Sequence, residues 1–196
     1  MEKRTNKVFL IAGTRGTGKT DFIKNIIAEA SKSFNKTLVV DTFDNPAWKD
    51  LSTWNHPDRL TQVPVIPLTK FPVWKKGIGK IYSSNTKELM ATIQEYAKNT
   101  FVVFEDATRY IGSKLTDDVN NFVLDSKQKN LDLVFIFHSL MSIPPDLVRV
   151  ADILILFKTN EGKIPEYKYP WPEIPIAMKE LKKSSNRYMY KIIPLN

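Results

Sequence analysis

A glycine-rich segment near the start of the chain constrains the fold more than any other feature. Residues 8–27 read VFLIAGTRGTGKTDFIKNII: an apolar run, then glycines, then lysine and threonine, then apolar residues at helical spacing. The pattern G-x-x-x-x-G-K-[ST] is satisfied at Gly13, Gly18, Lys19 and Thr20, after an expected strand and at the start of an expected helix. This context predicts a loop whose backbone N–H groups bind the phosphates of a nucleotide.

The residues of this loop have distinct expected roles. Glycines allow backbone conformations that other residues avoid, so the loop can close around phosphate groups. The Lys19 ammonium is expected to reach the β- and γ-phosphates, and the Thr20 hydroxyl is expected to bind Mg²⁺. The predicted cofactors are therefore ATP and Mg²⁺, and the predicted binding residues are Gly13, Thr14, Arg15, Gly16, Thr17, Gly18, Lys19 and Thr20.

Apolar runs elsewhere in the chain predict the architecture. They are continuous rather than alternating, which is typical of strands covered on both faces. Strands that alternate with helices predict an α/β fold with a mostly parallel central sheet flanked by helices. The expected strands are residues 7–13, 37–43, 100–106, 131–139 and 151–158, and the expected helices are residues 19–34, 85–99 and 115–130, with Asn85 and Thr116 as N-caps.

The chain of 196 residues is predicted to form a single domain with two less regular parts. Residues 44–84 contain five prolines and three tryptophans and are expected to be an irregular insertion with a short strand near residues 79–84. The tryptophans Trp48, Trp54 and Trp74 interleave with Lys49, Lys75 and Lys76. Stacking on nucleic-acid bases is one interpretation, and cover for an apolar patch or a subunit interface is the favoured one. Residues 160–196 are expected to be a C-terminal extension, either a partner-binding arm or an added edge strand.

The composition excludes several classes of protein. The chain contains no cysteine and two histidines, which excludes disulfides and leaves few ligands for zinc. No apolar run approaches the ~20 residues that span a bilayer, and a signal peptide is not expected, so a cytoplasmic protein without direct membrane insertion is predicted. The net charge of +8 suits a polyanionic partner, nucleic acid first, with a solvated basic surface as the other interpretation.

Two carboxylates follow a buried strand in the segment FVVFED, residues 101–106. Ligands of open α/β sheets bind at the carboxyl ends of the strands, so Glu105 and Asp106 are expected beside the phosphates. We assign Glu105 to the metal and Asp106 to the base that activates the attacking water. The alternative is a pair of surface carboxylates at a strand end.

Three later segments narrow the interpretation: FVVFEDATRYI at 101–111, DSKQKNLDLVFIFHSL at 125–140 and IPPDLVRVADILILFKT at 143–159. With the glycine-rich loop, their order and spacing resemble the HerA/FtsK superfamily of P-loop ATPases, in particular its small viral members that pump genomes into capsids. The resemblance spans about residues 7–159 and implies a RecA-like P-loop NTPase fold and assembly into a ring.

The chain also departs from the family pattern. Its acidic pair is Glu-Asp where the family has Asp-Glu, which leaves open which carboxylate has which role. His138 stands where the family usually has a glutamine sensor, and a structural histidine is the competing interpretation. Lys127 and Lys129 stand where the family suggests arginine, and lysine lacks the bidentate guanidinium.

Hydrolysis in such a ring needs a further cation at the γ-phosphate, because Lys19 alone cannot neutralise the charge of the transition state. Arg149 is the preferred candidate for a finger supplied to a neighbouring subunit, since PPDLVRVAD is expected to place it on a short turn near the sensor strand. Arg109 and Lys129 are the alternates. A structural salt bridge is the other interpretation for the two arginines.

The predicted function is an ATP-hydrolysing motor that translocates double-stranded DNA, most consistent with packaging of a viral or mobile-element genome. Contact with DNA is expected through phosphates and independent of sequence, and a capsid or portal-vertex protein is a further expected partner. The alternative is an assembly and export ATPase similar to the Zot-like proteins of filamentous phages, which would act at a membrane through a partner. A small-molecule kinase is disfavoured because no arginine-rich lid is visible.

Overall fold

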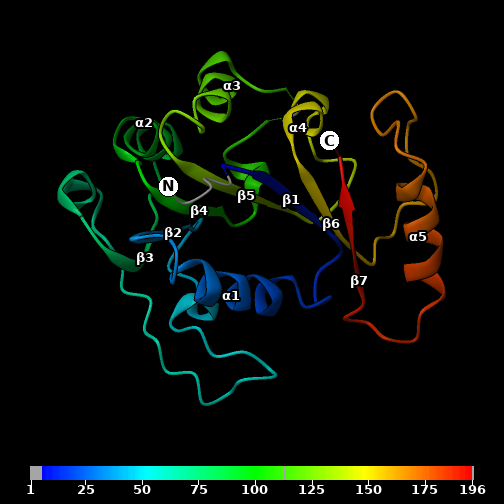
Figure 1. The fold of residues 1–196 in the computed structure, drawn as a ribbon, viewed down its shortest axis with the longest axis horizontal. Helices are drawn as coiled ribbons and strands as arrows, with labels where there is room; N and C mark the ends of the chain where they lie inside the picture. The colour runs from blue at the N-terminus through cyan, green and yellow to red at the C-terminus, as the bar shows by residue number, and fades with distance from the viewer. Residues whose placement is uncertain (1–5, 113, 196) are drawn as a thin grey trace.

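The computed structural model describes residues 6–112 and 114–195, which form one seven-stranded sheet with helices on both faces (Figure 1). The strand order is β3-β2-β4-β5-β1-β6-β7, and only the pairing of β6 with β7 is antiparallel among these described strands. The predicted α/β fold with a mostly parallel sheet is confirmed. The strands are β1 Val8–Ala12, β2 Lys36–Val40, β3 Gly77–Ile81, β4 Thr100–Phe104, β5 Leu131–Phe137, β6 Ile153–Phe157 and β7 Tyr190–Pro194.

The helices occupy both faces of the sheet and one end of it. Figure 1 shows α1 on one face, α2, α3 and α4 on the other, and α5 beside the edge formed by β7. Their bounds are α1 Lys19–Ala30, α2 Thr86–Tyr96, α3 Asp117–Leu124, α4 Pro145–Val150 and α5 Glu173–Lys183, with short 3-10 helices at Pro46–Trp48, Leu68–Val73 and Ala107–Arg109. No helix within the described ranges is long and apolar enough to span a membrane.

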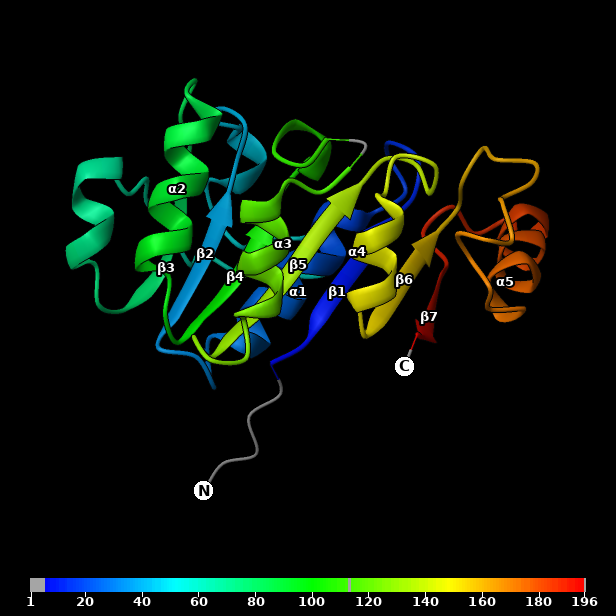
Figure 2. The ribbon, with the colours of Figure 1, turned by 90° about the horizontal axis from the view of Figure 1, so that it is seen from above.

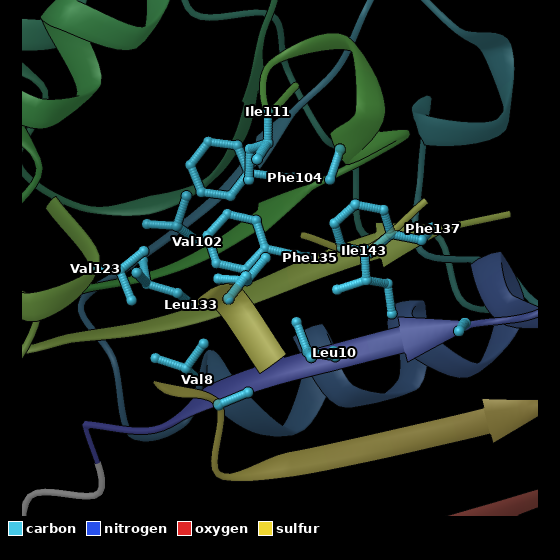
Figure 3. Packing of buried hydrophobic residues seen from close by; sticks show 14 of the residues in the cluster. Val8, Leu10, Val102, Phe104, Ile111, Val123, Leu133, Phe135, Phe137 and Ile143 are labelled. Atoms are coloured by element: carbon cyan, nitrogen blue, oxygen red, sulfur yellow. The ribbon is translucent and has the colours of Figure 1, made fainter. Parts of the chain in front are cut away.

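The hydrophobic core lies on both faces of the sheet, which explains the continuous apolar runs in the sequence. Alternate residues of a strand point to opposite faces, so Leu10 packs in the cluster on the α2–α4 face while Ile11 packs with Ile23 of α1. Figure 3 shows the larger cluster around β1, β4 and β5. There the rings of Phe104 and Phe135 stack with centroids 4.9 Å apart.

The helix starts agree with the predicted caps, but all three predicted helices end earlier than predicted. The Asn85 side chain accepts a hydrogen bond from Glu88 N at 3.2 Å, and the Thr116 hydroxyl accepts one from Val119 N at 3.4 Å. The α1 helix ends at Ala30 instead of residue 34, because the chain there tightens into turns that lead into β2. The α2 helix ends at residue 96 instead of 99, and α3 ends at residue 124 instead of 130. The α4 helix was not predicted from its proline-rich sequence.

The irregular segment 44–84 contributes to the core as well as to the surface. Trp48 is fully buried, and Trp74 packs against Phe71 with ring centroids 6.0 Å apart, so these two tryptophans cover apolar surface as favoured. Trp54 differs, since 82% of it is exposed. The predicted short strand is β3, which begins two residues earlier than expected. The C-terminal extension supplies α5 and the added edge strand β7.

Candidate nucleotide-binding site

Polar residues collect where four parallel strands end at one edge of the sheet. The register pairs Ala12 with Phe137 and Val40 with Phe104, so the loops that follow β1, β2, β4 and β5 are neighbours. The strands end one to three residues before the predicted limits, because the polar side chains that follow leave the sheet. These loops line an open cleft of about 580 Å³ that contains Arg15, Gly16, Gly18, Lys19, Thr20, Asp41, Glu105, Asp106, Arg109 and His138.

The glycine-rich loop is held in a conformation that its glycines permit. Gly16 and Gly18 have φ angles of 72° and 85°, in the left-handed region that side chains disfavour. Gly13 is needed for space, since a Cβ there would lie 2.5 Å from the Phe157 Cβ. The loop is anchored to the end of β6, because Thr14 N donates to the Lys158 carbonyl at 2.9 Å. This hydrogen bond and one from the Thr14 hydroxyl to the same carbonyl hold the start of the loop against the residue that follows β6.

The Lys19 ammonium lies inside this loop. Its Nζ donates to the carbonyls of Gly13 at 2.6 Å and Thr14 at 2.9 Å, and only 6% of the residue is exposed. Burial lowers the pKa of Lys19 to about 8, while the Glu105 carboxylate opposes that shift. A phosphate group in the cleft would favour the charged form and give the buried ammonium its counter-ion.

Glu105 presents a buried acceptor to the same cleft. Burial, followed by the nearby Asp41 carboxylate, raises the pKa of Glu105 to about 7. Its Oε2 atom is fully buried and accepts no hydrogen bond from the described residues. A carboxylate oxygen without a partner, with the Thr20 hydroxyl in the same cleft, fits a hard cation such as Mg²⁺. Among the described residues, no group of three or more histidine or acidic side chains is arranged to hold a metal ion by itself.

Asp106 and His138 also line the cleft. The Asp106 backbone has a φ of 48°, its Oδ1 accepts from the Thr108 hydroxyl at 2.6 Å, and its Oδ2 lies 3.4 Å from the Arg109 Nε. His138 follows β5, and its Nδ1 is buried with no hydrogen-bond partner in residues 6–112 and 114–195. Burial, followed by the charge of Lys19, lowers the pKa of His138, so its imidazole is neutral at physiological pH.

Two of the three cationic side chains predicted to act on the γ-phosphate lie away from the cleft of their own chain. Arg149 is in the last turn of the α4 helix, so its placement on a turn near the sensor strand was wrong. It is exposed and lies 3.0 Å from Asp146, beside the amino-terminal end of β6, which Figure 2 shows at the opposite edge from the carboxyl ends. Lys129 precedes β5 at that same edge and donates to the Gln94 carbonyl at 2.6 Å. Arg109, by contrast, lines the cleft.

Several residues that line or contact the site were not predicted. Asp41 follows β2, is fully buried and accepts hydrogen bonds from the backbone N–H of Thr42 at 2.8 Å and Asn45 at 3.1 Å. An acidic residue directly after an apolar strand was the available signal. Arg187 donates to the Arg15 carbonyl at 3.4 Å, and Tyr188 lies against Gly18. No local pattern marks these two, because they approach the loop from the far end of the chain.

Comparison with known proteins gives a match of fold. No protein-family model and no curated protein matches the sequence. The solved genome packaging NTPase B204 from Sulfolobus turreted icosahedral virus 2, in complex with ATP-gammaS, matches with a TM-score of 0.73 and 15% identity, over 97% of this chain and 92% of that one. The N-terminal domain of zonular occludens toxin from Neisseria meningitidis matches with a TM-score of 0.50 and 12% identity, over 80% of this chain and 78% of that one.

A third solved structure is the pCW3 conjugation coupling protein TcpA, with a TM-score of 0.51 and 10% identity, over 85% of this chain and 53% of that one. All three sequence identities are too low for function to be transferred, and the three structures agree with this chain in their architecture. The predicted resemblance to the small viral packaging ATPases is confirmed at this level. The chain has the fold of a RecA-like P-loop NTPase.

Proposed function

We propose that the chain is an ATPase that hydrolyses the β–γ phosphoanhydride and uses the cycle to package double-stranded viral DNA. The observation that carries the proposal is the cleft itself. A phosphate loop with a buried lysine faces an acidic pair and a histidine across one continuous space. A nucleotide-binding protein without hydrolysis would not need the second group of residues.

The residues of the cleft would have different roles in hydrolysis. Thr20 and Glu105 would hold Mg²⁺, which neutralises phosphate charge when it is bound. Lys19 binds the β- and γ-phosphates from inside the loop. Asp106, which is held by Thr108 and Arg109, would accept a proton from the attacking water. His138, which is neutral and follows β5, would hydrogen-bond the γ-phosphate or that water.

The position of Arg149 supports the proposal of a ring assembly. Because this arginine lies at the opposite edge from its own cleft, it can approach a γ-phosphate only in a neighbouring subunit. The proposed oligomer is therefore a homomeric ring. The net charge of +8 supports sequence-independent contact with DNA phosphates along such a ring. A capsid or portal-vertex protein is the proposed further partner, in the host cytoplasm or in the virion.

The fold similarity to the zonular occludens toxin domain favours one rival, an assembly and export ATPase that acts at a membrane through a partner. Measurement of phosphate release from ATP with and without double-stranded DNA separates the two functions. A packaging motor is expected to hydrolyse ATP faster with DNA of any sequence, and an export ATPase is expected to be indifferent to DNA.

Lys19→Ala tests the site in the same assay. This variant should fold and lose hydrolysis, because the ammonium that binds the β- and γ-phosphates is gone. Lys179→Ala, which removes an exposed lysine of α5, is the matched control. Turnover near the wild-type rate in Lys19→Ala would exclude the cleft as the ATPase site.

A further inference from the structure

An aromatic pocket adjoins the phosphate loop on the side away from Glu105 and Asp106, and Asp21 at the start of α1 also lines it. It has a volume of about 560 Å³, and its aromatic lining is Phe22, Trp54, Phe157, Tyr188 and Tyr190. Gly18 and Tyr188 line both this pocket and the catalytic cleft, so the two spaces are continuous at the end of the loop. The proposed mechanism of hydrolysis uses none of the five aromatic side chains.

The strand order sets the direction in which a bound nucleotide extends. The phosphate loop follows β1, with β5 and β4 on one side of it and β6 and β7 on the other. Glu105 and His138, beside which the γ-phosphate is proposed to lie, follow β4 and β5. Because the triphosphate is a linear chain through the loop, the nucleoside must leave toward β6 and β7. Phe157 ends β6 and Tyr190 begins β7, so the aromatic pocket lies in that direction.

The inner wall of this pocket is a packed aromatic cluster. The Phe22 ring of α1 lies 4.7 Å from the Tyr190 ring and 5.7 Å from the Phe157 ring, both in edge-on geometry. Tyr188 stands at the mouth, 57% exposed, where its ring carbon would be 3.0 Å from a Cβ at Gly18. The ring of Tyr188 therefore lies close to the loop, and more than half of the residue remains exposed.

Trp54 lines the pocket from the irregular segment. It is 82% exposed, yet it sits on a tight turn in which Thr53 and His56 exchange two backbone hydrogen bonds of 3.2 Å. The surrounding segment is tied to α1 twice, by Lys24 Nζ to the Ser52 carbonyl at 2.8 Å and by Arg59 to the Asn25 side chain at 3.0 Å. The exposed indole of Trp54, on a turn anchored to α1, provides a surface on which a planar ligand can stack.

We propose that this pocket is the nucleoside subsite, where Tyr188 and Trp54 stack on the base of the nucleotide held by the phosphate loop. The inference rests on the proposed nucleotide binding and adds the residues that recognise the base. They come from the insertion and from the C-terminal extension, so nucleotide occupancy is coupled to the position of both segments.

The subsite is tested with two ligands, one that carries a base and one that does not. The wild type, Tyr188→Ala and Trp54→Ala are titrated calorimetrically with a non-hydrolysable ATP analogue and with inorganic tripolyphosphate, both with Mg²⁺. Loss of one stacking partner should weaken binding of the analogue by between about 5-fold and about 150-fold. Binding of tripolyphosphate, which has no base, should not change. Tyr167→Ala, which removes a tyrosine that is 78% exposed outside the pocket, is the control.

Tryptophan fluorescence provides a readout that does not depend on affinity. The analogue should quench the emission of Trp54 in the wild type, tripolyphosphate should not, and Trp54→Phe should abolish the quenching. Unchanged affinity for the analogue in both alanine variants would overturn the subsite, as would an equal loss for both ligands. If the wild type binds tripolyphosphate and the analogue equally well, only the subsite fails; if it binds neither, the proposed nucleotide binding fails with it. A loss confined to oligonucleotide binding would assign the two rings to DNA instead.

Discussion

Replacement of Glu105 by glutamine is expected to stabilise the nucleotide-free protein, by an amount that grows as the pH rises from about 5 to about 7. The Oε2 atom of Glu105 is fully buried and accepts no hydrogen bond from the residues that the structure describes. Burial and the neighbouring Asp41 raise the pKa of Glu105 from 4.5 to about 7. When the cleft holds no cation, an ionised Glu105 is therefore a cost to the folded state.

The direction and size of the effect follow from linkage. In the unfolded chain the Glu105 carboxyl ionises near pH 4.5, whereas in the folded protein it keeps its proton until about pH 7. The folded state binds more protons in this interval, so its stability is highest below pH 4.5 and falls as the pH rises through about 7. The loss amounts to about 3 kcal/mol at about pH 8 and about 1 kcal/mol at about pH 5. Glutamine has nearly the same shape and does not ionise, so it avoids this loss.

The assay is thermal or urea denaturation of the wild type and Glu105→Gln in EDTA without nucleotide. At about pH 8 the variant should melt about 6–12 °C higher, and at about pH 5 the difference should shrink to a few degrees. Glu166→Gln, which removes an exposed carboxylate, is the control and should show no such pH dependence. An equal stability difference at both pH values, or a wild type more stable at about pH 8, would refute the argument.

Two further predictions concern hydrolysis. Asp106→Asn should bind ATP·Mg²⁺ normally and hydrolyse ATP slowly, whereas in Glu105→Gln the binding of ATP should depend less on Mg²⁺. Equal binding defects in both variants would contradict the assignment of Glu105 to the metal and Asp106 to the base. Arg149→Ala should bind ATP and hydrolyse it poorly, and mixing with inactive Lys19→Ala subunits should restore part of the activity, because intact composite sites then form between subunits. Absence of rescue at every mixing ratio, with a protein that remains monomeric in ATP and DNA, would exclude the trans finger.

Much of the fold could be predicted because its signals are local. The strands are buried on both faces, so their apolar runs are continuous, and the chain leaves the sheet where polar residues such as Glu105 and His138 begin. The N-caps at Asn85 and Thr116 need only residues three positions away. The helix ends were harder to predict, since α1 and α3 stop where turns toward the next strand compete with further helical residues.

The sequence by itself also determined the phosphate loop, because the conformation of Gly16 and Gly18 and the reach of Lys19 are properties of a few consecutive residues. Only the tertiary structure decided which distant residues share the cleft. It places Asp41 beside Glu105 and brings Arg187 and Tyr188 onto the loop.

Tertiary structure also decided which cations are excluded from the cleft. Arg109 and Arg149 look equivalent in the sequence, since each follows or precedes a strand. The parallel direction of β4 and β6 puts Arg109, after β4, at the carboxyl edge and Arg149, before β6, at the amino edge. Strand direction and order are set by the packing of the whole sheet and by right-handed crossovers, which no short stretch of sequence encodes.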